Sequence, residues 1–115
     1  MAHDDRMPSI EPDDAMRLIA GDGMLIDVRD AREWSHGHSP HSVHVPMDEL
    51  GPAIAVMPRQ RPVIVASRSG RRAEQAVVHL RAAGVDARVL HGGLRAWQAA
   101  GGELASDTGA PPRVD

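Results

Sequence analysis

Residues 62–84 read PVIVASRSGRRAEQAVVHLRAAG, and this stretch decides the fold class. It begins with the apolar run PVIVA (62–66), which is typical of a strand buried on both faces of a parallel sheet. An arginine-rich turn follows, and apolar residues then recur at helical spacing until Gly84 ends the helix. A strand that passes through a short turn into a helix is the repeating unit of α/β proteins.

The other apolar segments extend this pattern along the chain. Three further strands are predicted at MLIDV (24–28), SVHVP (42–46) and DARVL (86–90). Helical segments are predicted at SIEPDDAMRLIAGDG (9–23), MDELGPAIAVMP (47–58) and GGLRAWQAAGG (92–102), with one further helical turn inside RDAREWSHGHSPH (29–41). In the first of these helices, Pro12 suits the first helical position and Gly21 the end. We therefore expect an α/β fold with a mostly parallel sheet flanked by helices on both faces.

The length of the chain indicates a single domain. With 115 residues, 42% of them hydrophobic and 25% charged, it has the composition of a globular protein. We expect one domain over 9–104. Residues 1–8 and 105–115 show no periodicity and are predicted to be a flexible amino terminus and a flexible carboxyl-terminal tail.

Charge and composition exclude several classes of function. The net charge of −3 gives no reason to expect a nucleic acid or an anionic membrane as partner. The absence of cysteine excludes disulfides, thiolate metal sites and thiol catalysis, and the absence of lysine excludes Schiff-base chemistry. No run approaches the roughly 18 apolar residues of a membrane span, and the amino terminus lacks an apolar signal core, so a cytoplasmic location is expected.

The turn at 67–72 has the features of an anion site. Backbone N–H groups at the start of a helix lack partners and point into such a turn, where the helix dipole is positive. Gly70 permits the tight backbone that the turn needs. The predicted anion-binding residues are Ser67, Arg68, Ser69, Gly70, Arg71 and Arg72. An ordinary turn with solvated arginines is the alternative.

Three motifs in this order resemble the single-domain rhodanese family, and the resemblance covers residues 9–104. LIDVRDAREWSHGHSPHSVHVPMDEL (25–50) contains the Asp-Val-Arg, Glu-aromatic and Gly-His-x-Pro elements of the family's first signature. VASRSGRRA (65–73) resembles its active-site loop, and VLHGGLRAWQAAGGEL (89–104) its carboxyl-terminal pattern. The family transfers sulfur: a loop cysteine takes a sulfane sulfur from a donor such as thiosulfate and passes it to an acceptor. The resemblance places that cysteine at Ser67.

Serine at position 67 changes the chemistry that this loop supports. A helix amino terminus and arginines lower a cysteine pKa of about 8.5 into the neutral range, but a serine hydroxyl stays protonated without an adjacent base. The loop itself contains no base, although His38 or His91 could approach it in space. Phosphatases that share this fold carry an arginine six places after the nucleophile. Here that place is Ala73, so phosphatase activity is not expected.

The resemblance also suggests roles for residues outside the loop. Asp27 and Arg29 close the predicted strand 24–28, and we expect them to support the site structurally, with Arg29 pairing with Glu33 and Asp27 holding neighbouring loop N–H groups. His38 matches the family's Gly-His and is expected to position the site. Four histidines lie within HGHSPHSVH (36–44), but we predict no metal site and no cofactor.

Three functions remain open from the sequence. The first is a catalytically silent rhodanese-like module that binds a small anion such as thiosulfate, sulfate or phosphate, or an anionic group of a protein partner. The second is a Cys→Ser form of an active sulfurtransferase. The third and weakest is a serine hydrolase that uses the same pocket.

Overall fold

The computed structural model describes residues 7–115, so most of the segment expected to be a flexible amino terminus (1–8) lies outside the described residues. The sheet has five parallel strands in the order β1-β5-β4-β2-β3. They are β1 (Ser9–Ile10), β2 (Met24–Asp27), β3 (Ser42–His44), β4 (Val63–Ala66) and β5 (Ala87–Leu90). The structure confirms the four strands predicted from the sequence, which are β2, β3, β4 and β5. The edge strand β1 was missed, because Ser9 and Ile10 were assigned to the helix that follows.

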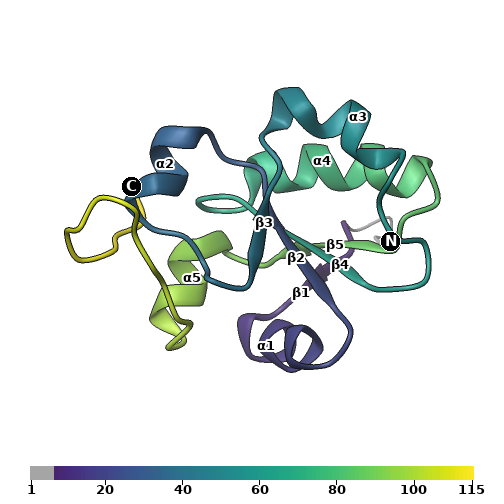
Figure 1. Ribbon diagram of the computed structural model, residues 1–115. Helices are drawn as coiled ribbons and strands as arrows, with labels where there is room; N and C mark the ends of the chain where they lie inside the picture. The colour runs from purple at the N-terminus through teal and green to yellow at the C-terminus, as the bar shows by residue number, and fades with distance from the viewer. Residues whose placement is uncertain (1–6) are drawn as a thin grey trace.

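The helices lie on both faces of the sheet, as predicted (Figure 1). They are α1 (Pro12–Ala20), α2 (Ala31–His36), the 3-10 helix η1 (Met47–Glu49), α3 (Leu50–Ile54), α4 (Arg71–Ala82) and α5 (Gly93–Ala99). Helices α1 and α5 cover one face and α3 and α4 the other. Pro12 occupies the first turn of α1 and Gly21 follows its end, as the sequence predicts.

Two apolar clusters form the core, one on each side of the sheet. Ile26 and Val65 pack with α4, whereas Leu25 and Ile64 pack with α1 and α5. Neighbouring residues of one strand therefore face opposite clusters. This explains why the strands read as continuous apolar runs rather than as alternating patterns.

The strand order places a topological switch between β2 and β4. The chain leaves β2 toward β3 on one side and leaves β4 toward β5 on the other. In open α/β sheets, the crevice beyond the carboxyl ends of two such strands is where ligands bind. Asp27 ends β2 and Ser67 follows β4, so both predicted motifs lie at this crevice.

The tail at 105–115 makes more contacts than the sequence predicts. It runs beside α2 (Figure 1), where Ala105 pairs with His38, and where the Asp107 and Arg113 N–H groups donate to carbonyl oxygens at the end of that helix, at 2.8 and 3.0 Å. The last carbonyls of a helix lack internal partners, and the tail supplies donors for two of them. The flexibility expected for this tail stays a prediction.

Within residues 7–115, no helix has the length and apolar character required to cross a membrane. The cytoplasmic location expected from the sequence stays a prediction.

Candidate active site at the loop 67–72

Ser67 lies at the centre of the loop and is almost fully buried, with 1% of its surface exposed. Its Oγ accepts hydrogen bonds from the N–H groups of Gly70, at 3.1 Å, and Ala73, at 3.2 Å. These two bonds curl the chain around position 67 and start α4. Gly70 has a φ of 113°, in the left-handed region that favours glycine, and this confirms why a glycine stands there.

The curl leaves several backbone donors free at the start of a twelve-residue helix. Among the described residues, no protein acceptor takes a hydrogen bond from the N–H groups of Arg68, Ser69, Arg71 and Arg72. Successive free N–H groups at the positive end of a helix dipole form an anion-binding concavity. The geometry therefore has the donors that the sequence predicts.

Helix α5 holds the outer side of the loop. The Leu94 N–H donates to the Ser67 carbonyl at 2.8 Å, and the Arg95 N–H donates to the Arg68 carbonyl at 3.2 Å. A Cβ at Gly93 would lie 2.4 Å from the Arg68 carbonyl oxygen, so no side chain fits there. The Gly92-Gly93 pair therefore lets α5 approach the loop closely.

The Arg72 side chain turns toward α2 and makes a bidentate ion pair with Glu33, at 2.7 and 2.8 Å. Glu33 also forms a capping box with Asp30 at the start of α2. The hydrogen bonds from Arg72 lower the pKa of Glu33, and Glu33 in turn raises the pKa of Arg72. Of the three loop arginines, only Arg68 and Arg71 therefore keep exposed side chains without a protein partner in the described residues.

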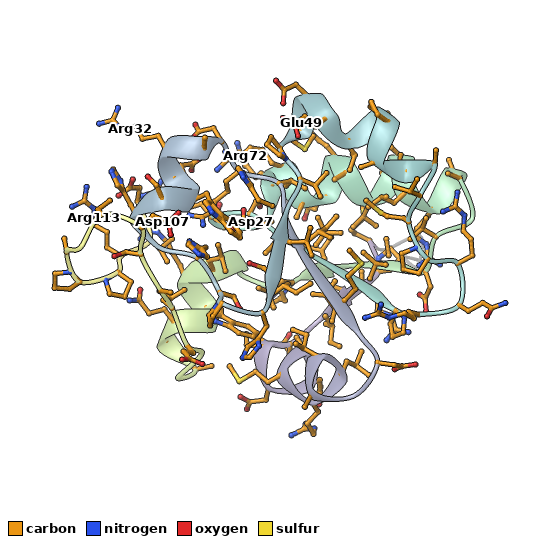
Figure 2. All side chains as sticks on the ribbon, in the orientation of Figure 1. Asp27, Arg32, Glu49, Arg72, Asp107 and Arg113 are labelled. Carbon is orange, nitrogen blue, oxygen red and sulfur yellow. The ribbon has the colours of Figure 1, made fainter. Side chains whose placement is uncertain are left out.

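A buried ion pair joins Asp27 and Arg29 at the end of β2. The Arg29 guanidinium donates to both Asp27 oxygens, with Nη2–Oδ2 at 2.8 Å, and also to the Gly37 carbonyl, at 2.7 Å. Asp27 further accepts the Arg29 N–H at 3.0 Å, as expected of a loop-holding carboxylate. The expected Arg29–Glu33 pair was wrong, because Arg29 precedes α2 and turns back toward Asp27. Asp27 lies close enough to Arg72 to raise its pKa (Figure 2).

His38 supports α2 rather than the loop directly. Its ring stacks on the Trp34 ring, with the two ring centroids 3.8 Å apart, and its Nδ1 lies 2.7 Å from the Trp34 carbonyl oxygen. His44 stacks on Trp34 as well, at 4.6 Å, and its Nε2 lies 2.8 Å from the Arg29 carbonyl. His36 instead pairs with Asp115. The sequence did not predict this stacking, because His38 follows the end of α2 and His44 belongs to β3, so helical spacing does not bring either ring to Trp34.

No base approaches Ser67 in the part of the chain that the structure describes. His38 is engaged with Trp34, and His91 is exposed beside a cavity of ≈ 330 Å³ that Ser69 and Gly70 also line. Within residues 7–115, the only hydrogen bonds of the Ser67 Oγ are those it accepts from the two N–H groups. Across the same residues, no group of three His, Asp or Glu side chains is arranged to hold a metal ion.

The family model described as the Rhodanese-like domain matches residues 11–100. The chain belongs to this family. The similar proteins include a thiosulfate sulfurtransferase of Pseudomonas savastanoi, 31% identical over 91 residues, covering 78% of this chain and 86% of that one. An HTH-type transcriptional regulator of Mycobacterium tuberculosis is 34% identical over 97 residues, or 83% of this chain, but the match spans only 42% of the regulator's length.

Solved rhodanese-like structures have the same fold. A rhodanese-related protein of Thermoplasma volcanium has a TM-score of 0.79 and 26% identity, covering 85% of this chain and 97% of that one. The solution structure of a rhodanese-like domain of Anabaena has a TM-score of 0.78 and 27% identity, and the match covers 96% of this chain and 89% of that one. The rhodanese-like α/β fold predicted from the sequence is therefore confirmed.

The buried pair predicts a large stability loss when one partner is removed. Arg29→Met leaves the Asp27 carboxylate buried without its counter-charge, which should reduce the free energy of unfolding by about 3–5 kcal/mol. Urea denaturation measures this change. The matched control is Arg88→Met, since Arg88 pairs with Asp86 at a half-exposed position and its loss should cost less than about 1 kcal/mol. Equal losses in the two variants would contradict the structural role of Arg29.

The Glu33–Arg72 pair predicts a pH-dependent contribution to stability. Because the folded-state pKa of Glu33 is lowered, its contribution is present above the usual glutamate value of about 4.3 and is lost as the pH falls through the lowered pKa. The stability difference between the parent and Glu33→Gln should therefore shrink on acidification. In an Arg72→Gln background, the same comparison should show a smaller pH dependence, because only the Asp30 N–H and Arg29 then lower the pKa of Glu33, and an unchanged dependence would contradict the assignment.

Proposed function

We propose that this chain is a rhodanese-like module that binds a small anion in the loop 67–72 and does not transfer sulfur while serine occupies position 67. The observation that carries the proposal is the environment of Ser67. Its buried Oγ accepts two backbone N–H bonds and contacts no base among the described residues, whereas the surrounding N–H groups are free.

The free donors favour a compact oxyanion as ligand. Thiosulfate, sulfate and phosphate each present several acceptor oxygens, which match convergent backbone N–H groups and a helix amino terminus. Arg68 and Arg71 add positive charge near the loop. Since the donors are mainly backbone groups, anion binding does not depend on which side chain stands at position 67.

Serine prevents the sulfur-transfer step because its hydroxyl is far less acidic than a cysteine thiol. In rhodanese chemistry, the cysteine thiolate attacks the sulfane sulfur of thiosulfate, a new S–S bond forms, and sulfite leaves with the electron pair of the broken bond. The N–H groups of Gly70 and Ala73 would stabilise a thiolate at position 67. A hydroxyl in the same place stays protonated because nothing nearby removes its proton.

The alternative is a Cys→Ser form of an active sulfurtransferase. The intact arrangement of donors around position 67 and the similarity to a named thiosulfate sulfurtransferase favour it. The similarity to a transcriptional regulator favours a binding or regulatory module instead. A serine hydrolase loses support, since within residues 7–115 Ser67 has no base.

Thiocyanate production from thiosulfate and cyanide tests the proposal. The parent chain should be inactive. The Ser67→Cys variant should produce thiocyanate, because it restores the nucleophile among unchanged backbone donors. Ser69→Cys is the matched control: it places a thiol in the same loop at an exposed position, and should be inactive. Turnover by the parent would contradict the role given to serine. An inactive Ser67→Cys variant that still folds would contradict the proposal that the backbone donors around position 67 form an intact sulfurtransferase site.

A further inference from the structure

The arginines of this chain differ in whether their side chains have partners. Within residues 7–115, most of them pair with a carboxylate or a carbonyl oxygen: Arg17, Arg29, Arg59, Arg61, Arg72, Arg81, Arg88 and Arg113. In the same residues, the arginine side chains without a hydrogen bond or ion pair are Arg32, Arg68, Arg71 and Arg95. An exposed arginine without an internal partner is available to a partner outside the chain.

Three of these four arginines lie in the loop or on a helix whose backbone contacts it. Arg68 and Arg71 belong to the loop and to the first turn of α4, and Arg95 belongs to α5. The Arg95 N–H donates to the Arg68 carbonyl at 3.2 Å, so the two elements are in direct contact there. All three side chains are exposed. We call these three residues the arginine patch.

The patch keeps its positive charge although the whole chain is acidic. The net charge is −3, and the carboxylate of Glu33, across the site, is already paired with Arg72. Glu74, in the first turn of α4, is an exposed carboxylate beside the cavity that Ser69 and Gly70 line, and Glu11 and Asp13 line a pocket with Ala96 of α5. None of these carboxylates pairs with an arginine of the patch within residues 7–115.

We propose that the arginine patch docks an acidic segment of a protein partner, whose aspartate and glutamate side chains contact the three guanidinium groups and cover the mouth of the loop. The inference deepens the proposed function, since it names the partner of the same mouth. A small anion held by the loop amides does not require Arg95, which comes from a separate element. A chain of several carboxylates matches guanidinium groups that are distributed over two elements.

The same surface is a poor match for nucleic acid. Single-stranded nucleic acid needs exposed aromatic rings on which bases stack. Trp97 is 3% exposed, and Trp34 stacks with His38 and His44, so neither ring is free.

Fluorescence anisotropy with labelled octaglutamate tests the patch. The peptide should bind the parent chain at low ionic strength and weaken as salt is added. Arg68→Gln, Arg71→Gln and Arg95→Gln should each weaken binding by about two- to fivefold, and the triple variant by about tenfold or more. Arg32→Gln is the matched control, since this exposed arginine also lacks a partner among the described residues but lies on the outer side of α2, away from Arg72 (Figure 2).

Calorimetry with sulfate separates this inference from the proposed function. Arg95→Gln should weaken octaglutamate binding while leaving the affinity for sulfate unchanged, because the substitution removes no hydrogen-bond donor of the loop. Sulfate binding without octaglutamate binding would overturn the patch alone, and the reverse result would overturn the small-anion site alone. Equal loss of octaglutamate in Arg32→Gln, or tighter binding of an oligodeoxythymidine than of octaglutamate, would also overturn the patch.

Discussion

The two hydrogen bonds that Ser67 Oγ accepts from Gly70 and Ala73 are the interaction on which the rest of the site depends. They fix the path of the chain between β4 and α4, and they point the neighbouring N–H groups into the concavity rather than toward protein acceptors. The same bonds would stabilise a thiolate on a cysteine. On serine they hold a neutral hydroxyl, which is why we propose that this arrangement binds anions with either residue but transfers sulfur only with cysteine.

Two separate braces keep this loop in place. On one side, Gly93 lets α5 approach the loop carbonyls closely. On the other side, Arg72 joins the loop to Glu33 on α2. Helix α2 is itself fixed by the buried Arg29, which bonds to the Gly37 carbonyl, and by the tail along its carboxyl end. The loop is thus held from both sides, and preorganisation of this kind would favour the proposed anion site.

Much of the fold was predictable because the strands β2 and β4 are almost fully buried and read as largely apolar runs. The loop was predictable as well, since Gly70 and the Gly92-Gly93 pair mark tight turns in the sequence. The strand β1 escaped prediction because a two-residue edge strand carries no periodic signal. Local spacing is also the reason that Arg29 was paired with Glu33: the helical four-residue rule does not apply to a residue that precedes the helix.

Contacts between segments far apart in sequence account for the remaining differences. The Glu33–Arg72 pair joins residues 39 positions apart, and nothing in either local sequence selects the other. The tail was expected to be flexible because its sequence is polar and aperiodic. Its contacts to α2 use backbone N–H groups, which every residue other than proline has, so composition could not predict them.

The most direct test of the account is an NMR titration of the uniformly ¹⁵N-labelled chain with sulfate. The account predicts that the largest amide shift changes occur at the free N–H groups of the loop, those of Arg68, Ser69, Arg71 and Arg72. The amides of Gly70 and Ala73, which already donate to Ser67, should change less. Saturable shifts confined to the loop would support an anion site made by the backbone. Unchanged loop amides, or shifts centred on another surface, would contradict it.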